Sequence, residues 1–402
     1  MKTNVVCIDG TWNLPGQTDA DPGEKIVTES ETNVLRIFRF LTKITHENLQ
    51  IPVGCPTPLV GDLSGNSGFA LYLTGVGSSG GRLAQAWNGA TGTGTSERIM
   101  EAYRFLAEFH EHDNQLFLFG FSRGAFAARS LAGFLDCVGL PSPPRRLGAL
   151  ELNALYERYR QQTQHQPLPS GHKRVEVNFL GVWDTVGALA FGAPIARWHK
   201  ISPGNVKQVA QALALDERRS SFQPEFWKNN DTHTVVDEMW FLGAHSNVGG
   251  GYANKELSNI ALAWMVWMAF KAGLPTDKQY IEGWYRENAM GTARHSHKEF
   301  LRWLGPLQPW VVGSSSRMIL PHQRFHSTVF ERMEYSKDSP YMPAARFSDG
   351  RPFPKSAAIL PKHQVVETPD YLTPESIDPS ALRRTCDSTM SDTMGIDVFD
   401  VP

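Results

Sequence analysis

The most informative segment of the chain reads Leu116-Phe117-Leu118-Phe119-Gly120-Phe121-Ser122-Arg123-Gly124-Ala125. Its apolar run predicts a short buried strand, and residues 124–135 resume the spacing of a helix. A serine between two glycines at such a turn indicates a nucleophile elbow, in which the turn lifts the hydroxyl above the edge of a sheet. The alternative is an ordinary strand–turn–helix whose serine caps the helix. We take Ser122 as the candidate nucleophile.

The elements around this turn predict an α/β protein. Further strands are expected at residues 5–8, 175–182 and 235–242, and helices at residues 33–41 (capped by Thr32 or Asn33), 96–109, 206–215 and 256–273. Strands that are separated by helices favour a largely parallel central sheet with helices on both faces. Together with the elbow, this pattern predicts an α/β-hydrolase-like fold.

The chain divides into two predicted regions. Residues 1–345 form the expected catalytic domain, within which residues 54–95 are rich in Gly, Ser and Thr and should be mostly loop. A loop of that length is rarely a passive connection, so we expect a lid or a pocket wall. Residues 346–402 are rich in proline and polar residues and form an irregular C-terminal extension.

The composition of the chain restricts which binding partners and which cellular compartment we expect. The net charge of −2 over 402 residues gives no general attraction to nucleic acid. The four cysteines are scattered, which favours neither a zinc site nor a disulfide framework. The N-terminus lacks the apolar region of a signal peptide, and the apolar run at residues 260–270 is too short to span a bilayer. We expect a cytoplasmic protein as synthesised, open to export by a signal-independent route.

A serine nucleophile needs a base, usually a histidine, that is oriented by a carboxylate. In this fold the three residues follow the order serine, acid, histidine, and each lies just past the end of a strand. Asp184 directly ends the apolar run at residues 177–183, whereas Asp237 and Glu238 belong to the opposite end of their strand. Asp184 is therefore the candidate acid.

Thirteen histidines compete for the role of base. His110 and His112 precede the elbow strand and should lie at its far end. His245 follows the strand expected at residues 235–242 and opens a glycine-rich loop, which puts it on the same rim as Ser122 and Asp184. The alternative is a loop histidine with a structural hydrogen bond. Position and chain order together favour His245 as the base.

An acyl-transfer site also needs donors for the oxyanion. One should be the backbone N–H of Arg123, next to the nucleophile, and the other usually comes from a loop after an early strand. Gly10 and Thr11 follow the first expected strand and are the candidates for this second donor. The alternative is a simple strand-ending turn. Residues 216–219, Asp-Glu-Arg-Arg, are interpreted as a structural ion-pair network at the end of the helix expected at residues 206–215.

Several blocks of sequence together resemble a known family. They are Asp9-Gly10-Thr11-Trp12-Asn13, Gly120-Phe121-Ser122-Arg123-Gly124-Ala125, Gly181-Val182-Trp183-Asp184-Thr185-Val186 and His245-Ser246-Asn247-Val248-Gly249-Gly250-Gly251-Tyr252, with residues 216–219 and 326–332 similar to later blocks. The family is the uncharacterised α/β-hydrolase domain typified by the catalytic domain of type VI secretion phospholipase effectors. The resemblance covers residues 4–345 and implies the same triad and activity on carboxyl esters, with phospholipids as the best-known substrates.

The sequence departs from the family's pattern at Asn247, where an aspartate is expected. Asp9 and Asn247 are candidates for supporting the site. The predicted activity is that of a serine carboxylic ester hydrolase, lipolytic and phospholipase A-like, which needs no cofactor or metal. Its partner would be a small-molecule or lipid ester, with transient contact at a membrane surface and no nucleic acid. The alternatives are a hydrolase of other acyl substrates, such as amides or polyesters, and a non-catalytic binding or assembly module on a hydrolase scaffold.

Overall fold

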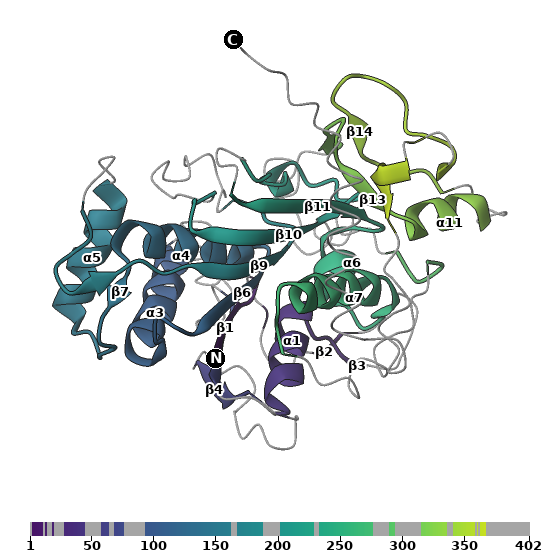
Figure 1. Cartoon of the computed structure of the whole chain (residues 1–402). Helices are drawn as coiled ribbons and strands as arrows, with labels where there is room; N and C mark the ends of the chain where they lie inside the picture. Colours follow the sequence, from purple (N-terminus) through teal and green to yellow (C-terminus); the bar gives the residue numbers. More distant parts are fainter. Residues whose placement is uncertain are drawn as a thin grey trace, which may run out of the picture.

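A twisted sheet forms the centre of the molecule (Figure 1). The computed structural model describes residues 2–10, 13, 18–19, 28–44, 58–63, 68–75, 93–161, 167–187, 202–228, 233–275, 289–293, 315–335, 341–357, 360 and 362–366. Within these ranges the sheet has nine strands, in the order β15 (Val365–Val366), β13 (Arg324–His326), β11 (Val235–Phe241), β10 (Val206–Ala214), β9 (Val177–Trp183), β6 (Gln115–Phe121), β1 (Thr3–Ile8), β5 (Gly68–Leu73) and β4 (Leu59–Asp62). All neighbours are parallel except β4 and β5. The predicted largely parallel sheet is confirmed.

Helices cover both faces of this sheet (Figure 1). One face carries α3 (Thr93–Phe109), α4 (Arg123–Val138) and α5 (Ala149–Gln161), and the other carries α1 (Asn33–Thr42) and α7 (Glu256–Lys271). Successive side chains of β1 point to opposite faces of the sheet, which explains this division. Val6 and Ile8 belong to the core beneath α3, α4 and α5, whereas Val5 and Cys7 belong to the core beneath α1 and α7. The predicted α/β fold with two helical layers is confirmed.

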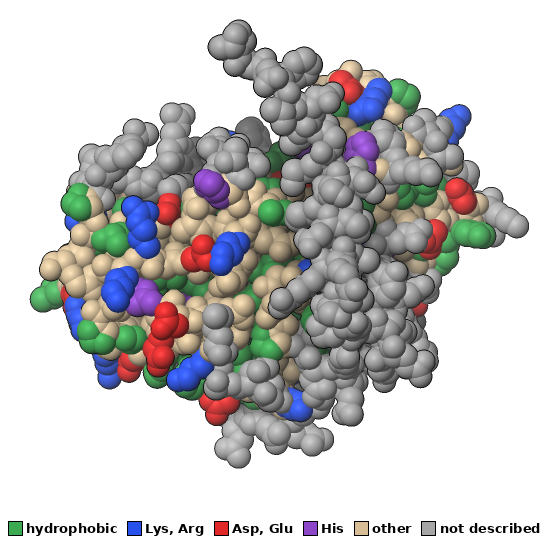
Figure 2. All heavy atoms as spheres, viewed as in Figure 1, with side chains coloured by type: hydrophobic (Ala, Val, Ile, Leu, Met, Phe, Trp, Pro, Cys, Tyr) green, Lys and Arg blue, Asp and Glu red, His purple; other side chains and the backbone are tan. Residues whose placement is uncertain are grey.

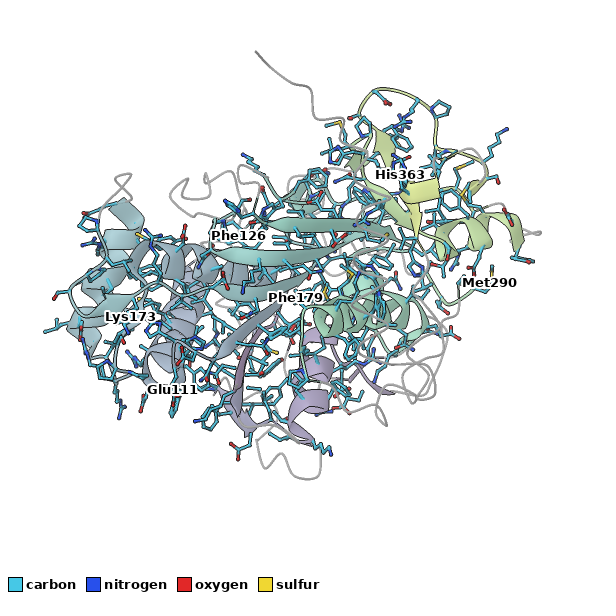
Figure 3. The ribbon with its side chains drawn as sticks, in the orientation of Figure 1. Glu111, Phe126, Lys173, Phe179, Met290 and His363 are labelled. Atoms are coloured by element: carbon cyan, nitrogen blue, oxygen red, sulfur yellow. The ribbon has the colours of Figure 1, made fainter. Side chains whose placement is uncertain are left out.

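Shorter elements complete the described chain. They are β2 (Thr18–Asp19), β3 (Thr28–Glu29), β7 (Leu140–Pro141), β8 (His172–Lys173), η1 (Ser220–Phe222), α6 (His245–Gly249), β12 (Met318–Ile319), α11 (Thr328–Tyr335), β14 (Arg346–Phe347) and η5 (Lys362–Gln364). Phe179 of β9, labelled in Figure 3, lies in the middle of the sheet, where its ring packs against Phe117 and Phe119 of β6. Among the helices that the structure describes, none combines the length and the apolar character that crossing a membrane requires.

Two expected elements differ in the structure. Residues 206–214 of the helix expected at residues 206–215 form strand β10 instead, which lies between β9 and β11 and whose last six residues are buried on both faces. Such a strand shows no alternation of apolar and polar residues, so its pattern also fits a helix. The second difference falls within residues 54–95, where β4 and β5 form an edge of the main sheet. Residues 54–57, 64–67 and 76–92 of the expected lid lie outside the described residues.

The C-terminal part of the chain packs on the β11 end of the sheet. β13 pairs with β11, and β15 pairs with β13, so the main sheet continues past residue 345. Figure 3 places Met290 and His363 at this end of the molecule, far from Lys173 and Glu111. The division at residue 345 stays a prediction, and residues 367–402 of the expected tail lie outside the described residues.

The register of the parallel strands brings the predicted site residues to one edge. Ile8 of β1 pairs with Gly120 of β6, and Phe121 pairs with Trp183 of β9. β10 and β11 end together, because Ala214 pairs with Phe241. The residues that follow these strands therefore emerge side by side at the carboxyl edge of the sheet, where parallel α/β folds bind ligands. On the face drawn in Figure 2, described side chains of both charge signs are interspersed.

Candidate active site

Ser122 occupies a sharp turn between β6 and α4. Its φ of 59° and ψ of −123° lie where residues other than glycine are rarely found. Its N–H donates to the Trp183 carbonyl at 3.0 Å, which ties the turn to the end of β9. Although Ser122 stands at the N-cap position of α4, its side chain makes no capping hydrogen bond. The strained backbone and the unused cap match the geometry of an elbow.

The two flanking glycines are required by close backbone approaches. A Cβ on Gly120 would lie 2.6 Å from the Ala125 Cα, at the start of α4. A Cβ on Gly124 would lie 2.2 Å from the Ile8 carbonyl oxygen at the end of β1. Neither backbone can move aside without displacing a central element, so both positions accept only glycine. The motif therefore sets how tightly α4 packs on the sheet.

Asp184 and His245 meet at the edge of the sheet. Asp184 follows β9 with a φ of 44°, and its N–H donates to the Ala212 carbonyl of β10 at 2.7 Å. His245 Nδ1 lies 2.5 Å from Asp184 Oδ2, and because a carboxylate only accepts hydrogen bonds, Nδ1 carries the proton. Both side chains are buried. His245 begins the short helix α6 rather than the loop expected from its glycines.

Aromatic rings enclose the imidazole of His245. The ring of Phe121, the residue before the elbow serine, lies 4.5 Å from it between centroids, and that of Phe222 meets it edge-on at 5.0 Å. Burial lowers the pKa of His245 below its ordinary value, although the hydrogen bond and charge of Asp184 oppose this shift. The structure thus places His245 beside the elbow, bound to Asp184 and in its neutral form at neutral pH.

Arg317, which the sequence did not indicate, is fully buried against Asp184. Its Nη1 donates to Asp184 Oδ1 at 2.5 Å and to the Ala214 carbonyl at 2.8 Å. Its Nη2 donates to Asp184 Oδ2 at 2.9 Å and to the Phe222 carbonyl at 2.6 Å. Burial alone would raise the pKa of Asp184, but the charge of Arg317 and the contacts with His245 outweigh burial and lower it to about 2. Asp184 is held ionised.

A second ion pair supports His245 from the other side. Glu217 is fully buried, and both of its carboxylate oxygens accept hydrogen bonds of 2.8 Å from the guanidinium of Arg219. The backbone N–H of His245 also donates to Glu217 Oε2 at 3.3 Å. Burial would raise the pKa of Glu217, but the charge and hydrogen bonds of Arg219 dominate and lower it well below its usual range. The Asp-Glu-Arg-Arg block thus contains the structural ion pair that its composition suggested.

Asp216 of the same block connects the site to the C-terminal region. Its Oδ2 accepts from the Gly243 N–H at 2.9 Å and from the Tyr341 hydroxyl at 2.7 Å. Its Oδ1 accepts from the Ala344 N–H at 3.1 Å. The block follows strand β10 and not a helix, which brings it to the same edge as His245.

On the opposite side of Ser122, Asp9 organises the turn after β1. Its buried carboxylate accepts hydrogen bonds of 2.6 Å from the Thr32 hydroxyl, the Tyr72 hydroxyl and the Gly10 N–H. Burial raises the pKa of Asp9 to about 6, against the effect of these hydrogen bonds. Thr32 also caps α1 by accepting from the Leu35 N–H, which decides between the two caps, Thr32 and Asn33, that the sequence left open. Asp9 therefore ties β1, β5 and α1 together beside the elbow.

The oxyanion donors expected from the sequence stay predictions. Gly10 lies against the elbow, since a Cβ there would come within 3.1 Å of the Ser122 Cβ, and its N–H donates to the Asp9 carboxylate at 2.6 Å. Thr11 lies outside the described residues. Arg123 is the first residue of α4, where backbone amides have no partner within the helix, so the expected role of its N–H stays open.

Asn247, the departure from the family's pattern, has a structural place. Its side-chain oxygen accepts from the Ala244 N–H at 3.2 Å, and its side-chain nitrogen donates to the Thr292 carbonyl at 3.2 Å. It thereby caps the helix that begins with His245. A neutral amide suits this position because it can accept and donate at once, which an ionised aspartate cannot.

A strained serine, a buried histidine–aspartate pair and two buried ion pairs thus lie along one edge of the sheet. Within the described ranges, no three side chains of His, Cys, Asp or Glu gather in the manner of a metal site. The family model of the type VI secretion system phospholipase effector, Tle1-like, catalytic domain, matches residues 2–268. The chain belongs to this Tle1-like family. The model's match ends within α7, well before Arg317.

Other similarities are more distant. An uncharacterized protein of Saccharomyces cerevisiae, YEL023C, is 30% identical over 142 residues, a region that makes up 31% of this chain and 20% of the yeast protein. A crystal structure of an uncharacterized protein from Pseudomonas aeruginosa is 20% identical, with a TM-score of 0.40, and the match covers 69% of this chain and 46% of the other. The Tle1 effector bound to the VgrG spike is 21% identical, with a TM-score of 0.32, over 63% of this chain and 52% of that one. The chain thus spans about half or less of the length of these relatives.

Proposed function

We propose that this protein is a serine carboxylic ester hydrolase that releases fatty acids from phospholipids. The observation that carries the proposal is the 2.5 Å contact between His245 Nδ1 and Asp184 Oδ2 on the sheet edge where Ser122 occupies an elbow. Membership of a phospholipase effector family supports the lipid substrate. The site is suited to acyl transfer because Ser122, Asp184 and His245 follow the parallel strands β6, β9 and β11 in the chain order nucleophile, acid, base that this fold uses.

In the proposed reaction, Ser122 Oγ attacks the ester carbonyl while His245 Nε2 accepts the hydroxyl proton. The ester bond then breaks, and the imidazolium gives its proton to the leaving alcohol, which is a lysophospholipid. Asp184 keeps the other imidazole proton on Nδ1 and stabilises the positive charge that forms. Water, activated by the same histidine, hydrolyses the acyl-enzyme and releases the fatty acid. The substrate carbonyl oxygen becomes negative in both steps, and we assign the Arg123 and Thr11 amides to it.

Lipid release with mass-spectrometric identification of products tests this function. Purified protein is incubated with mixed micelles of phosphatidylethanolamine or phosphatidylglycerol, and free fatty acid and lysophospholipid should appear in equal amounts. Ser122→Ala should abolish release. Ser130→Ala is the matched control, because this serine is buried in the same helix and its hydroxyl makes no hydrogen bond. Release that persists in Ser122→Ala, or activity on short esters but on no phospholipid, contradicts the proposal.

A further inference from the structure

Arg317 belongs to a part of the chain beyond the family match, yet its contacts with Asp184 are as direct as those of His245. All four of its Nη hydrogens have acceptors, two on the Asp184 carboxylate and two on the backbone carbonyls of Ala214 and Phe222. The Asp184 carboxylate in turn accepts four hydrogen bonds, two from Arg317, one from His245 and one from the Ala214 N–H. Such a saturated arrangement leaves Asp184 one orientation.

The charges around His245 form two pairs. Asp184 and Glu217 are the buried carboxylates, and Arg317 and Arg219 are their partners. With both pairs intact, the carboxylate charges are balanced close to the ring. Without Arg317, two carboxylates would face a single guanidinium, and the unbalanced negative charge would favour protonation of the coupled Asp184–His245 pair. The sign does not depend on which of the two residues takes up the proton.

We propose that Arg317 is a positioning residue that keeps the Asp184–His245 pair free of the extra proton in mildly acidic surroundings, so that His245 remains able to act as a base there. The inference rests on the proposed function in one respect, because it takes His245 as the base. It adds a role for the C-terminal region, which would complete the site by neutralising and orienting the acid of the triad. The region is then part of the catalytic unit.

Two substitutions separate charge from geometry. Arg317→Gln removes the charge, whereas Arg317→Lys keeps the charge but offers three N–H donors to four acceptors. Arg324→Gln is the matched control, since Arg324 pairs in the same sheet with Asp237, which lies in the first half of β11 and not at the carboxyl edge that carries the site. Each protein is compared in the pH profile of kcat/KM for a soluble ester and in the titration of the His245 Cε1–H by NMR, assigned by its loss in His245→Gln.

The acidic midpoint of both profiles should rise by about one pH unit or more in Arg317→Gln, the usual effect of losing an opposite charge at this distance. In Arg317→Lys the midpoint should change little, because the positive charge remains. The kcat should fall, because an ammonium group cannot donate to both carboxylate oxygens in parallel as the guanidinium does. Arg324→Gln should match the wild type in both readouts. A merely structural role for Arg317 would lower kcat in both variants and leave the midpoints unchanged, and that result would overturn the inference.

The kinetic profile and the NMR titration test the proposed function and the role of Arg317 separately. Absence of ester hydrolysis in the wild type would count against the proposed function, while the NMR titration would still measure the effect of Arg317 on His245. If Arg317→Gln does not fold, as circular dichroism would reveal, Arg317→Met replaces it, because methionine removes the charge and fills much of the same buried space. The His245 midpoint of this variant should also rise by about one pH unit or more, and an unchanged midpoint would overturn the inference.

Discussion

Replacing Asp184 by asparagine should uncouple the acid from both of its charged partners. Asparagine has one acceptor oxygen, whereas the Asp184 carboxylate accepts hydrogen bonds on both oxygens. Because Arg317 donates to each oxygen, the new amide N–H₂ faces a guanidinium N–H in either orientation. The substitution therefore leaves the Arg317 charge buried without a counter-charge whichever way the amide turns.

Stability and activity should both fall, for different reasons. Removing one partner of a buried ion pair lowers the free energy of unfolding by about 3–5 kcal/mol. When the amide oxygen accepts from Arg317 Nη1 and the Ala214 N–H, the amide N–H₂ faces His245 Nδ1. Nδ1 must then accept a hydrogen bond, so the imidazole adopts the wrong tautomer for taking the proton of Ser122. In a serine triad this change lowers kcat on the order of 10⁴-fold.

A double substitution separates the two effects. Urea unfolding gives the stability of the wild type, Asp184→Asn, Arg317→Gln and the double variant, and hydrolysis of a p-nitrophenyl ester gives the activity. Removing both charges should recover at least about 2 kcal/mol relative to the sum of the single variants, because contacting residues couple. Activity should stay low in all three variants. Additive losses of stability, or near wild-type kcat in Asp184→Asn, would refute the role of this ion pair.

Three further predictions rest on the same contacts. Because burial lowers the pKa of His245, its neutral form persists below pH 6.5, so the acidic midpoint of kcat/KM should lie below that value; a midpoint above 7 would contradict it. The pKa of Asp9 in the folded protein is raised to about 6, so protonation of Asp9 favours the folded state. This contribution to the free energy of unfolding, up to about 3 kcal/mol, is complete below about pH 4 and is lost as the pH rises through 6. Urea unfolding between pH 4 and 7 should show this loss in the wild type but not in Asp9→Asn, and parallel curves would contradict it. Gly249→Ala places a Cβ 2.0 Å from the ring of Phe121, which packs on His245. The substitution should lower the free energy of unfolding by about 1–3 kcal/mol and reduce kcat. An unchanged kcat would show that the Phe121 ring does not position the histidine.

The parts of the site that sequence predicted are those that local pattern controls. The elbow requires two glycines and a serine at fixed spacing after an apolar strand, and these requirements are visible within ten residues. Asp184 and His245 could be chosen because Asp184 directly follows one apolar strand and His245 comes shortly after another, and parallel strands bring their carboxyl ends to one edge. Their hydrogen bond then follows from topology, although they are 61 residues apart.

The parts that sequence missed depend on distant packing. Arg317 is 133 residues from Asp184 and stands in a segment with no motif of its own, so only the folded chain shows that it is buried against a carboxylate. Strand β10 has apolar residues at a spacing that also fits a helix, because most of the strand is buried on both faces of the sheet and therefore need not alternate apolar and polar residues. The engagement of the Gly10 N–H depends on Asp9 being buried among Thr32 and Tyr72, which come from two other elements.

The most direct test of the account is the site of attack by a fluorophosphonate probe. Such a probe phosphonylates a serine only when a neighbouring base activates it, so the adduct marks the nucleophile without a known substrate. Tryptic mapping of the labelled protein should find the adduct on Ser122, and labelling should disappear in Ser122→Ala but persist in Ser130→Ala. An adduct on another serine, or undiminished labelling of folded Ser122→Ala, would contradict the assignment.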